Sequence, residues 1–527
     1  MPQREGASTS LWMATARALQ PPPLAHDEEA DVCVIGAGIA GLTVAYRLAR
    51  AGQRVIVLDE RGIGLGQTAR STAHLCNALD DRYYELIRLH GEEGACVAAQ
   101  SHASAIDAIE TICRDEAIAC DFNRVDGYLV DAHGEEDSVE LECELHAAHR
   151  VGVDVERVRE APGPWSAFGP ALRFPRQAQF HPVCYLDGLA QAVQRHGGQL
   201  YGRTRASAVH GGRYATVEAR HGPQVRAGAI VVATNTPFND RLAIHTKQAA
   251  YRTYVIALRL PPEPLPAALL WDTGVPYHYV RIAQASHEHW LLVGGEDHKV
   301  GQEEDPTTAW EQLEVWARRR FPMAGDVGHR WSGQVHEPVD ALAFIGRNPG
   351  DAENVYVVTG DSGNGLTHGT IAGELVTQLI LGDPAPWAWL YAPDRINTHS
   401  AERYLRENLN TMAQYYELFT GSEVESLAQI APGTGAIVRD GLSKRAVYRD
   451  RDGQYCVHSA ICPHLGGVVH WNAAECSWDC PAHGSRFDAR DGRCLHGPAA
   501  HGLAPAVLGE ALPPPQQTTL APPSLQR

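Results

Sequence analysis

Two short segments near the C-terminus carry residue types that bind metals. Cys462-Pro-His464 and Cys480-Pro-Ala-His483 each offer one thiolate and one imidazole, and fifteen residues separate them. This mixed set suits a two-iron cluster in which one iron takes both thiolates and the other takes both imidazoles. Neutral imidazole stabilises ferrous iron, so such a cluster has a more positive potential than one held by four thiolates. We expect Cys462, His464, Cys480 and His483 to bind a [2Fe–2S] cluster.

Zinc is the alternative, because two cysteines and two histidines also form a tetrahedral Zn²⁺ site. A zinc finger, however, takes two cysteines from one segment and two histidines from another. Here each segment holds one of each. Gly484-Ser485, and a later Gly497-Pro498 segment placed to cover the cluster, also resemble Rieske domains. The pattern therefore indicates a Rieske [2Fe–2S] domain.

The chain departs from the Rieske domains of respiratory complexes at three positions. Those domains join the two ligand segments by a disulfide, whose cysteines stand where this chain has Gly467 and Ala482. They also place a Tyr hydroxyl near a cluster ligand, where this chain has Phe487. Loss of a hydrogen bond to a cluster sulfur lowers the potential. We expect a ferredoxin-like centre of lower potential, in which Ser485 keeps a hydrogen bond to a bridging sulfide.

A glycine fingerprint near the N-terminus predicts a dinucleotide site. Gly36-Ala-Gly38-Ile-Ala-Gly41 matches the pattern G-x-G-x-x-G. The first glycine allows a tight turn, the second lets the backbone approach a pyrophosphate, and the third permits close packing of helix on strand. Asp59 follows 18 residues after Gly41, where a carboxylate accepts hydrogen bonds from a ribose. The alternative is a Gly-rich turn in an unrelated sheet.

The elements around the fingerprint argue against that alternative. Residues 31–36 and 54–59 are short apolar runs, and residues 42–49 place Leu and Ala on one face of a helix. Such a β–α–β unit implies a parallel, doubly wound sheet. Further along the chain, apolar and alternating stretches at 251–259, 277–282 and 290–294 favour an antiparallel sheet, inserted where a substrate pocket is usual.

Three further segments resemble the D-amino-acid oxidase-like flavoproteins, which include glycine and sarcosine oxidases and related amine oxidases. Residues 66–74 resemble the segment that wraps the flavin pyrophosphate and runs under the isoalloxazine ring. Residues 229–235 resemble a later apolar strand of that family. Residues 354–370 resemble its strand, Gly-rich turn and helix N-terminus, which face the polar edge of the flavin. The resemblance implies FAD, with the binding residues Gly36, Gly38, Gly41, Asp59, Ser71, Thr72, Gly360, Gly363 and Gly365.

The resemblance also implies a reaction. In these flavoproteins a hydride passes from the carbon of a C–N bond to the flavin, and the resulting imine hydrolyses. A substrate carboxylate would call for an Arg, whose guanidinium matches it in two hydrogen bonds. Arg281 lies on a middle strand where family members place substrate-binding groups, and Tyr277 and Tyr279 are placed to cover the flavin ring. The alternative for all three is packing on a half-exposed strand. Covalent attachment of the flavin through His74 or Cys76 is a further alternative, although neither matches a familiar attachment motif.

The two cofactors together favour an amine or amino-acid dehydrogenase that passes electrons singly through the cluster to an external acceptor. A Rieske mononuclear-iron oxygenase would need a 2-His-1-carboxylate site after the Rieske segment, and only a short tail follows here. A non-catalytic flavin and Rieske protein, used for electron transfer or redox sensing, is the remaining alternative.

We therefore expect an α/β fold: an FAD-binding Rossmann-like domain with an inserted antiparallel substrate domain, followed by an all-β Rieske domain. The expected boundaries are a flexible N-terminal arm (1–30), an oxidoreductase (31–383), a linker with a helical segment (384–432), a Rieske domain (433–510) and a Pro-rich tail (511–527). Within the oxidoreductase we expect FAD-binding parts at about 31–150, 200–235 and 336–383, and substrate-domain parts at about 151–199 and 236–335.

The charge and the cysteine distribution limit the binding partners and the cellular location that we expect for this protein. Asp and Glu number 63 against 45 Lys and Arg, which gives a net charge of −18 over 527 residues. That balance opposes binding to nucleic acid or to anionic lipid. The first 30 residues hold no signal-peptide core, and no apolar run is long enough to span a membrane. We expect a cytoplasmic protein whose C-terminal cysteines serve a metal rather than disulfides.

Overall fold

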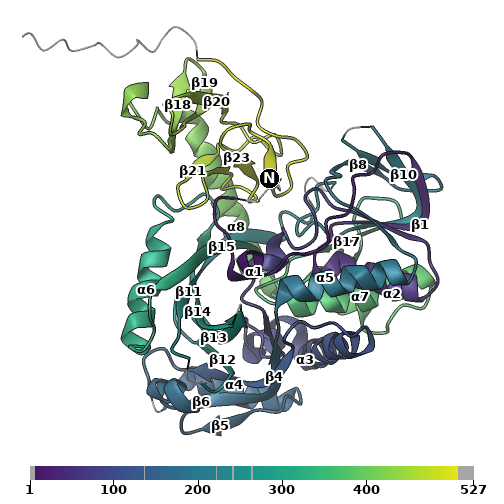
Figure 1. Ribbon diagram of the computed structural model, residues 1–527, viewed down its shortest axis with the longest axis vertical. Helices are drawn as coiled ribbons and strands as arrows, with labels where there is room; N and C mark the ends of the chain where they lie inside the picture. The colour runs from purple at the N-terminus through teal and green to yellow at the C-terminus, as the bar shows by residue number, and fades with distance from the viewer. Residues whose placement is uncertain are drawn as a thin grey trace, which may run out of the picture.

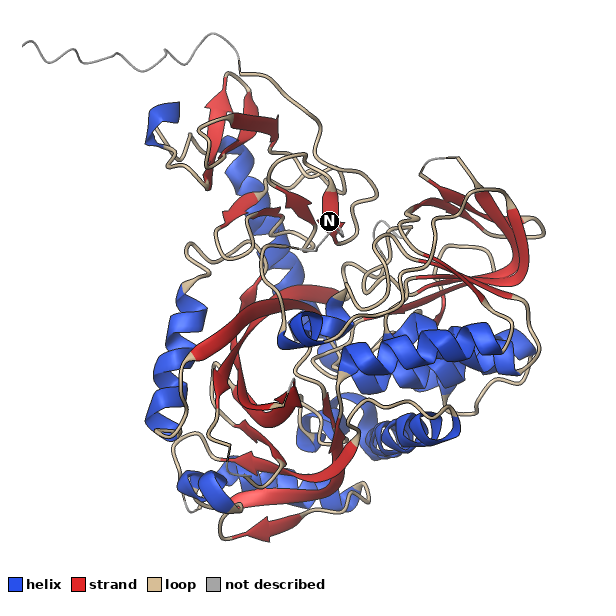
Figure 2. Ribbon diagram, viewed as in Figure 1, coloured by secondary structure: helices blue, strands red, loops and turns tan. Residues whose placement is uncertain are grey.

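The structure is a computed structural model that describes residues 6–135, 137–220, 222–239, 243–262, 265–285 and 287–508. Two large sheets with their helices form a body, and a smaller C-terminal unit (residues 434–508), drawn in yellow-green, sits on top of it (Figure 1). Figure 2 shows the helices grouped against the sheets of the body, whereas the C-terminal unit is built from short strands and loops. The α/β class and the all-β C-terminal unit predicted from the sequence are confirmed.

The first large sheet has a parallel centre built from the apolar runs around the fingerprint. Parallel strands are buried on both faces, which is why Val55-Ile-Val-Leu58 is apolar throughout instead of alternating. The central strands are, in spatial order, β17 (Val355–Thr359), β10 (Gln224–Val232), β1 (Glu28–Ile35), β2 (Val55–Leu58) and β7 (Gln199–Tyr201). The sheet is completed by β8 (Ala206–His210), β9 (Ala215–Ala219) and β16 (Phe344–Arg347).

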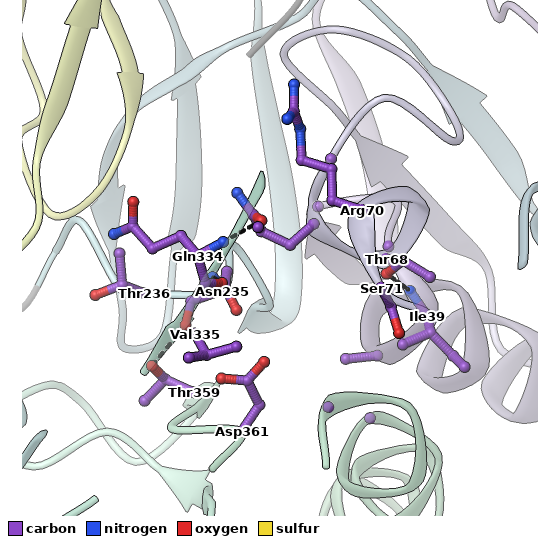
Figure 3. Close-up of a pocket in the computed structure, with 18 of the residues that line it drawn as sticks. Ile39, Thr68, Arg70, Ser71, Asn235, Thr236, Gln334, Val335, Thr359 and Asp361 are labelled. Carbon is purple, nitrogen blue, oxygen red and sulfur yellow. Dashed lines mark hydrogen bonds between the residues drawn. The ribbon is translucent and has the colours of Figure 1, made fainter. Parts of the chain in front are cut away.

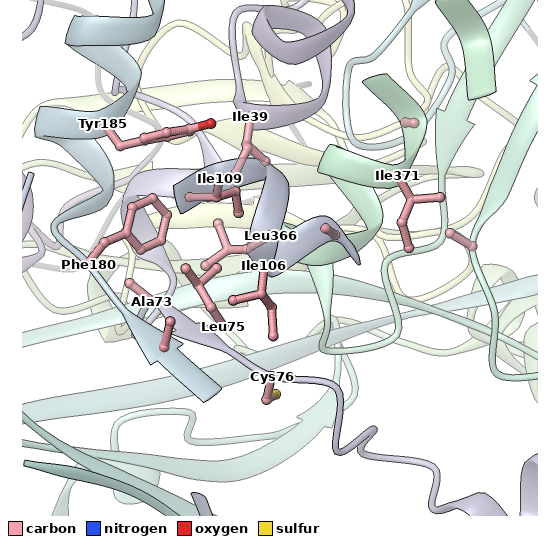
Figure 4. Packing of buried hydrophobic residues seen from close by; sticks show 14 of the residues in the cluster. Ile39, Ala73, Leu75, Cys76, Ile106, Ile109, Phe180, Tyr185, Leu366 and Ile371 are labelled. Atoms are coloured by element: carbon pink, nitrogen blue, oxygen red, sulfur yellow. The ribbon is translucent and has the colours of Figure 1, made fainter. Parts of the chain in front are cut away.

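Helices pack on this sheet through apolar faces. Helix α2 (Ile39–Arg50), which follows the fingerprint, contacts both α5 (Pro182–Arg195) and α7 (Gly365–Leu381), and the long α3 (Tyr83–Asp115) packs against α7. Figure 4 shows the centre of this packing, where side chains from all four helices meet the segment that follows the fingerprint unit. The labelled residues are Ile39, Ala73, Leu75, Cys76, Ile106, Ile109, Phe180, Tyr185, Leu366 and Ile371.

The second large sheet is mostly antiparallel, as the alternating stretches predicted. Its strands are β15 (Val327–Pro338), β11 (Gln248–Arg259), β14 (Glu288–Lys299), β13 (His278–Ala285), β12 (Ala268–Asp272), β4 (Asn123–Val130), β6 (Ala171–Gln179), β3 (His74–Leu75) and β5 (Glu156–Val158). Helix α6 (Thr308–Arg320) covers β11 and β14, and α4 (Val139–Arg150) packs against α3.

The division of the body differs from the expected one in two places. Strand β4 lies within the expected FAD-binding part, yet it pairs with β6 and β12 in the second sheet. Helix α5 lies within the expected substrate part, yet it packs on α2 of the first sheet. The chain crosses between the sheets more often than local patterns reveal, because strand pairing is set by residues far apart in sequence.

From residue 6, where the described chain begins, the N-terminal segment is packed into the body, whereas a flexible arm was expected over residues 1–30. A short helix, α1 (Leu11–Thr15), buries Leu11 and Trp12 completely. The Ser10 hydroxyl donates to the carbonyl of Ala69 at 2.6 Å, and the Trp12 indole donates to the carbonyl of Ser71 at 2.7 Å. These buried apolar and hydrogen-bonded contacts hold the segment in place, so it supports the stretch that follows the fingerprint unit.

The expected linker region begins inside the body. Leu390 and Tyr391 are fully buried, and the Tyr391 hydroxyl lies 2.7 Å from the hydroxyl of Ser101. Helix α8 (Ala401–Gln414) follows and leads upward into the C-terminal unit (Figure 1). That unit holds two small sheets, β18 (Thr434–Asp440), β19 (Ser443–Arg449) and β20 (Tyr455–Ser459), and β21 (His470–Asn472), β22 (Ser477–Asp479), β23 (Arg486–Asp488) and β24 (Cys494–His496). The expected Pro-rich tail lies outside the described residues.

A buried carboxylate fastens the C-terminal unit to the body. Glu475 lies 3.0 Å from Arg252 of β11 and 3.3 Å from Arg70, and all three side chains are at most 1% exposed. Burial alone would raise the pKa of Glu475, but Arg70, Arg252 and Arg486 together lower it to about 2. The backbone N–H of Ser8 donates to the same carboxylate at 3.0 Å. We call Glu475 with these three arginines the Glu475 anchor.

Glu475→Gln is expected to destabilise the folded protein by about 3–5 kcal/mol, because it leaves buried guanidinium groups without their counter-charge. Urea denaturation followed by tryptophan fluorescence measures this loss, with the exposed Glu304→Gln as the matched control. Since the folded pKa of Glu475 lies below the ordinary value of 4.5, its contribution is present above about pH 4.5 and disappears as the pH falls toward 2. Equal stability of E475Q and the native protein at pH 7 would refute the anchor.

Candidate flavin and iron–sulfur sites

A cavity of about 290 Å³ lies between the two large sheets and is lined by most of the predicted flavin-binding residues. We call it the central cavity. Figure 3 shows its two walls, one with Ile39, Thr68 and Ser71 and the other with Asn235, Gln334 and Thr359. The predicted residues that line it are Gly36, Gly38, Asp59, Ser71, Thr72, Gly363, Gly365, Tyr277 and Tyr279. Gly41, Gly360 and Arg281 are not among its described lining residues.

The fingerprint glycines are required by close backbone approaches. A Cβ on Gly41 would overlap the carbonyl oxygen of Gly36, and a Cβ on Gly36 would overlap the carbonyl oxygen of Ala233. Gly36 also has a φ of +107°, which other residues rarely adopt. Gly38 precedes α2, so the first N–H groups of that helix face the cavity. The fingerprint turn therefore fits a pyrophosphate.

Asp59 ends the second strand as predicted and faces the cavity. Its carboxylate accepts hydrogen bonds from the backbone N–H groups of Ala37 at 2.9 Å and of Arg61 and Gly62 at 2.8 Å each. Burial raises the pKa of Asp59, and the three N–H groups oppose that rise. The carboxylate therefore ties the fingerprint turn to the loop after β2, at the position where a ribose is expected.

The second predicted flavin contact is the turn before α7. Gly363 has a φ of +71°, and a Cβ there would overlap the carboxylate of Asp80. Gly365 begins α7, and the Thr359 hydroxyl donates to the carbonyl of Asn235 at 2.6 Å, which joins the ends of β17 and β10. Burial raises the pKa of Asp361, in the same turn, to about 6. Acidic groups therefore stand beside the positive end of α7, a feature that the sequence pattern did not reveal.

The segment 66–74 runs along the wall that also contains Ile39 (Figure 3). The Thr68 hydroxyl accepts a hydrogen bond from the N–H of Ile39 at 3.2 Å, and the Ser71 hydroxyl accepts one from the N–H of Ala73 at 2.9 Å. His74 and Cys76, the two residues considered for covalent attachment, both line the cavity. Burial lowers the pKa of His74 to about 3, so its imidazole is neutral.

Arg281 does not point into the central cavity, contrary to the substrate-binding role expected for it. One guanidinium nitrogen donates to the carbonyls of Thr72 at 3.0 Å, Ala73 at 2.7 Å and Phe180 at 3.3 Å. The guanidinium also lies over the Trp12 ring, 5.3 Å from its centre. The side chain is 3% exposed, and its contacts hold the segment 66–74 in position.

The wall opposite the fingerprint is formed by the second sheet, and we call it the sheet end of the cavity. Tyr277 and Tyr279, which were predicted to cover the flavin ring, lie there with ring centres 5.6 Å apart. The sequence analysis missed Thr253, Trp271 and Asp297, which line the same wall. The available signal for Asp297 was the acidic pair Glu296-Asp297, which follows the buried run of β14.

The four predicted cluster ligands come together in the C-terminal unit. Cys462 and Cys480 are buried with their thiols in hydrogen-bond contact, and the rings of His464 and His483 lie with centres 5.0 Å apart. Each ligand segment closes a tight turn, with the N–H of Gly466 donating to the carbonyl of Cys462 at 3.0 Å. Within the described residues, no three His, Cys, Asp or Glu side chains converge on one metal position. A thiol pair beside an imidazole pair is the donor set of a two-iron cluster, in which each iron takes two protein ligands.

The two ligand segments are as close as a disulfide would require, although Gly467 and Ala482 stand where the disulfide cysteines would be. A Cβ on Gly467 would lie 3.3 Å from the Cβ of Ala482 and 3.1 Å from the sulfur of Cys480. The Ser485 hydroxyl accepts a hydrogen bond from the N–H of Ala499 at 3.2 Å and contacts the Cys462 thiol. Phe487 is fully buried in the core of the unit.

The ligand segments face the body. The Gln334 side chain donates to the carbonyl of Gly484 at 2.8 Å, while Gln334 itself lines the central cavity. The ring of His245, which precedes β11, lies 4.9 Å from that of His464 and 6.1 Å from that of His483, measured between centres. His496 of β24 also lines the cavity. Gln334 therefore connects the wall of the central cavity directly to the second ligand segment.

Comparison with known proteins identifies the class. A family model described as FAD dependent oxidoreductase (DAO) matches residues 31–379, and one described as Rieske [2Fe-2S] domain matches residues 423–507. The chain belongs to the DAO family of FAD-dependent oxidoreductases and carries a C-terminal Rieske domain. FAD and a [2Fe–2S] cluster are its cofactors, which sets the zinc alternative aside.

Individual relatives share this organisation in whole or in part. The chain is 28% identical over 498 residues to a Rieske 2Fe-2S iron-sulfur protein of Bacillus subtilis, YhfW, covering 94% of this chain and 96% of that one. It is 25% identical to the gamma-glutamylputrescine oxidoreductase of Escherichia coli, over 71% of this chain and 89% of that one. The fold of the body matches glycine oxidase from Geobacillus kaustophilus with a TM-score of 0.58 at 18% identity, over 70% of this chain and 99% of that one.

The helices were also compared with the requirements of a membrane span. Among the residues described, none of them combines the length and the apolar character needed to cross a bilayer.

Arg281→Met is expected to lower the stability of the protein by about 3 kcal/mol, because three buried carbonyl groups lose their donor. Chemical denaturation measures the loss, and flavin content after gel filtration reports on the segment 66–74. The exposed Arg319→Met on α6 is the control. Unchanged stability combined with weaker binding of carboxylate-bearing substrates would restore the substrate-binding role for Arg281.

Phe487→Tyr is expected to raise the midpoint potential of the cluster by about 50 mV, since a new hydroxyl hydrogen bond to a sulfur favours the reduced state. A redox titration followed by EPR measures the shift. Phe487→Leu alters the same packing without adding a hydroxyl and should leave the potential near its native value. Equal potentials for F487Y and F487L would show that this position does not reach the cluster.

Proposed function

We propose that this protein oxidises a C–N bond of an amine or amino acid by hydride transfer to FAD and passes the electrons singly through its [2Fe–2S] cluster to an external acceptor. The observation that carries the proposal is the position of Gln334, which lines the central cavity and donates to the carbonyl next to His483. Direct electron transfer needs the two cofactors to lie close together, and fusion of the Rieske domain to the flavin-binding body would provide that proximity.

The residues proposed to hold FAD surround one continuous cavity. Gly36, Gly38 and Asp59 would bind the dinucleotide end, and the turn at Gly363 and Gly365 would face the polar edge of the flavin. The FAD supplies a two-electron acceptor for hydride, and the side chains bind and orient the substrate. The substrate would bind at the sheet end of the same cavity, where polar and aromatic side chains form the wall.

The residues proposed to hold the cluster are Cys462, His464, Cys480 and His483. His245 packs against the rings of the two ligand histidines, and His496 stands in the wall of the central cavity. Their aromatic rings shorten the through-space gap between the two cofactors. A dehydrogenase that delivers electrons to a protein or quinone acceptor in the cytoplasm fits this arrangement.

The alternative of a non-catalytic redox protein has less support. A sensing or relay protein needs no substrate wall, whereas the sheet end carries carboxylate and aromatic groups that face the cavity. The relative named gamma-glutamylputrescine oxidoreductase, which the body matches over most of its length, favours an amine-oxidising enzyme.

Anaerobic addition of a substrate amine to the full-length protein is expected to bleach the flavin and then produce the rhombic EPR signal of a reduced Rieske cluster. Cys462→Ser should remove that signal and slow the reduction of a one-electron acceptor, because the reduced flavin loses its outlet. Cys456→Ser is the matched control, since Cys456 is a half-buried cysteine of the same unit that is not a predicted ligand. A flavin that bleaches while the native cluster stays oxidised would refute internal electron transfer.

A further inference from the structure

The sheet end of the central cavity combines acidic and aromatic side chains. Asp80 and Asp297 line it, and the rings of Trp271, Tyr277 and Tyr279 stand around them. Burial raises the pKa of each carboxyl group to about 7, and the charge of Asp80 adds to the rise at Asp297. Two carboxylates in a confined site without a cation between them are costly, so this arrangement is suited to a positively charged ligand.

One carboxylate oxygen is available for such a ligand. The Oδ1 atom of Asp297 is buried and has no hydrogen-bond partner among the residues that the structure describes. The hydroxyl of Thr253 bonds to the Asp297 carboxylate and lies 2.6 Å from the hydroxyl of Tyr279. A hydroxyl carries no charge, so it does not neutralise the carboxylate. A buried acceptor without a donor is unfavourable in the empty protein, and an ammonium group would satisfy it.

No lysine or arginine lines this end of the cavity among the described residues. His74, which lies beside Tyr279, is neutral because burial lowers its pKa to about 3, and Arg82, whose charge opposes the raised pKa of Asp80, is not a lining residue. The lining arginines are Arg61, Arg70 and Arg205, and all three are engaged elsewhere. Arg70 belongs to the Glu475 anchor, while Arg61 and Arg205 bind Glu60 and the backbone of the C-terminal unit. A substrate carboxylate at the sheet end would therefore meet two carboxylates and no guanidinium.

The aromatic rings complete an ammonium-binding arrangement. Tyr277 and Tyr279 lie side by side in the cavity wall, with their rings tilted by 39° to each other. Trp271, which is 4% exposed, lines the same cavity. Aromatic faces attract cations, and the attraction strengthens when water is excluded. Two further carboxylates, Asp81 and Glu337, form ion pairs with Arg403, at 3.3 Å and 3.7 Å. One cation therefore faces two carboxylates there, which leaves net negative charge.

Resting on the proposed function, we propose that the sheet end selects an aliphatic diamine or polyamine, and that Asp297 holds the ammonium group that does not react. At the reacting end, the carbon loses a hydride to the flavin and the nitrogen loses a proton, which gives an imine. Water then adds to the imine and releases an aldehyde and an amine or ammonia. The second ammonium group keeps its charge throughout and sets the position of the C–N bond.

The test compares 1,4-diaminobutane with butylamine, and both with glycine, L-proline and D-alanine, using the full-length protein with both cofactors under anaerobic conditions. Flavin bleaching gives a half-saturating concentration for each compound. The diamine is expected to saturate at least about tenfold below butylamine, because a charge-assisted hydrogen bond in a dry site contributes about that factor. Asp297→Asn should reduce this preference by about tenfold.

Two variants control for folding and for general charge. Asp297→Glu keeps the carboxylate and should retain part of the preference. Asp383→Asn removes an exposed carboxylate after α7 and should retain all of it. Flavin content and the thermal midpoint of each variant establish that it is folded. A preference for the diamine that survives D297N overturns the role of Asp297.

The outcomes separate this inference from the proposed function. Bleaching by the amino acids but not by the diamine would overturn the diamine site and leave amine or amino-acid oxidation standing. A flavin that dithionite reduces and none of the five compounds bleaches would overturn both. A diamine that raises the thermal midpoint without bleaching the flavin would support the binding site and overturn the reaction.

Discussion

The relative position of the two cofactor sites depends on one buried charge. Glu475 comes from the C-terminal unit, and its carboxylate is held by Arg70 from the flavin-side segment and Arg252 from the second sheet. A buried carboxylate is tolerated only where cations and donors surround it, so the three segments reach low energy in a single arrangement. That arrangement sets the cluster ligands against β11 and β15 and brings His496 into the wall of the central cavity. The ion pair reaches the wall of the central cavity through Arg70, so it ties the C-terminal unit directly to the flavin site.

The parts of the molecule that could be predicted from sequence are those encoded by neighbouring residues. The fingerprint from Gly36 to Gly41 and the two ligand segments of the cluster are local patterns, and the class and cofactors that they indicated are confirmed by the family matches. Arg281 illustrates the limit of such patterns. Its type and strand suited a substrate contact, but its partners, Thr72 and Phe180, are 209 and 101 residues away and leave no trace in the local sequence. The packed N-terminal segment was missed for the same reason.

Charge divides the central cavity into two regions. At the nucleotide end, arginines stand near the fingerprint and are neutralised by Glu60 and by Glu475. At the sheet end, carboxylates face one another, and burial makes each a weaker acid than usual. A pyrophosphate and a cation therefore find complementary surroundings at opposite ends of one space. The Gly363 turn and the N-terminus of α7 lie at the boundary, where Asp80 and Asp361 moderate the positive end of the helix.

The contribution of Cys494, His496 and Gly497 to the cavity wall has a consequence for how the protein matures. These residues line the same cavity as the fingerprint glycines, so the C-terminal unit supplies part of the wall around the dinucleotide site. Since this unit follows the flavin-binding parts along the chain, it leaves the ribosome after them, and flavin loading can precede iron–sulfur insertion during synthesis. Detachment of the unit would remove part of the wall around the dinucleotide. Retention of the flavin is therefore coupled to attachment of the C-terminal unit, and flavin loss on dilution or heating would report on detachment of that unit.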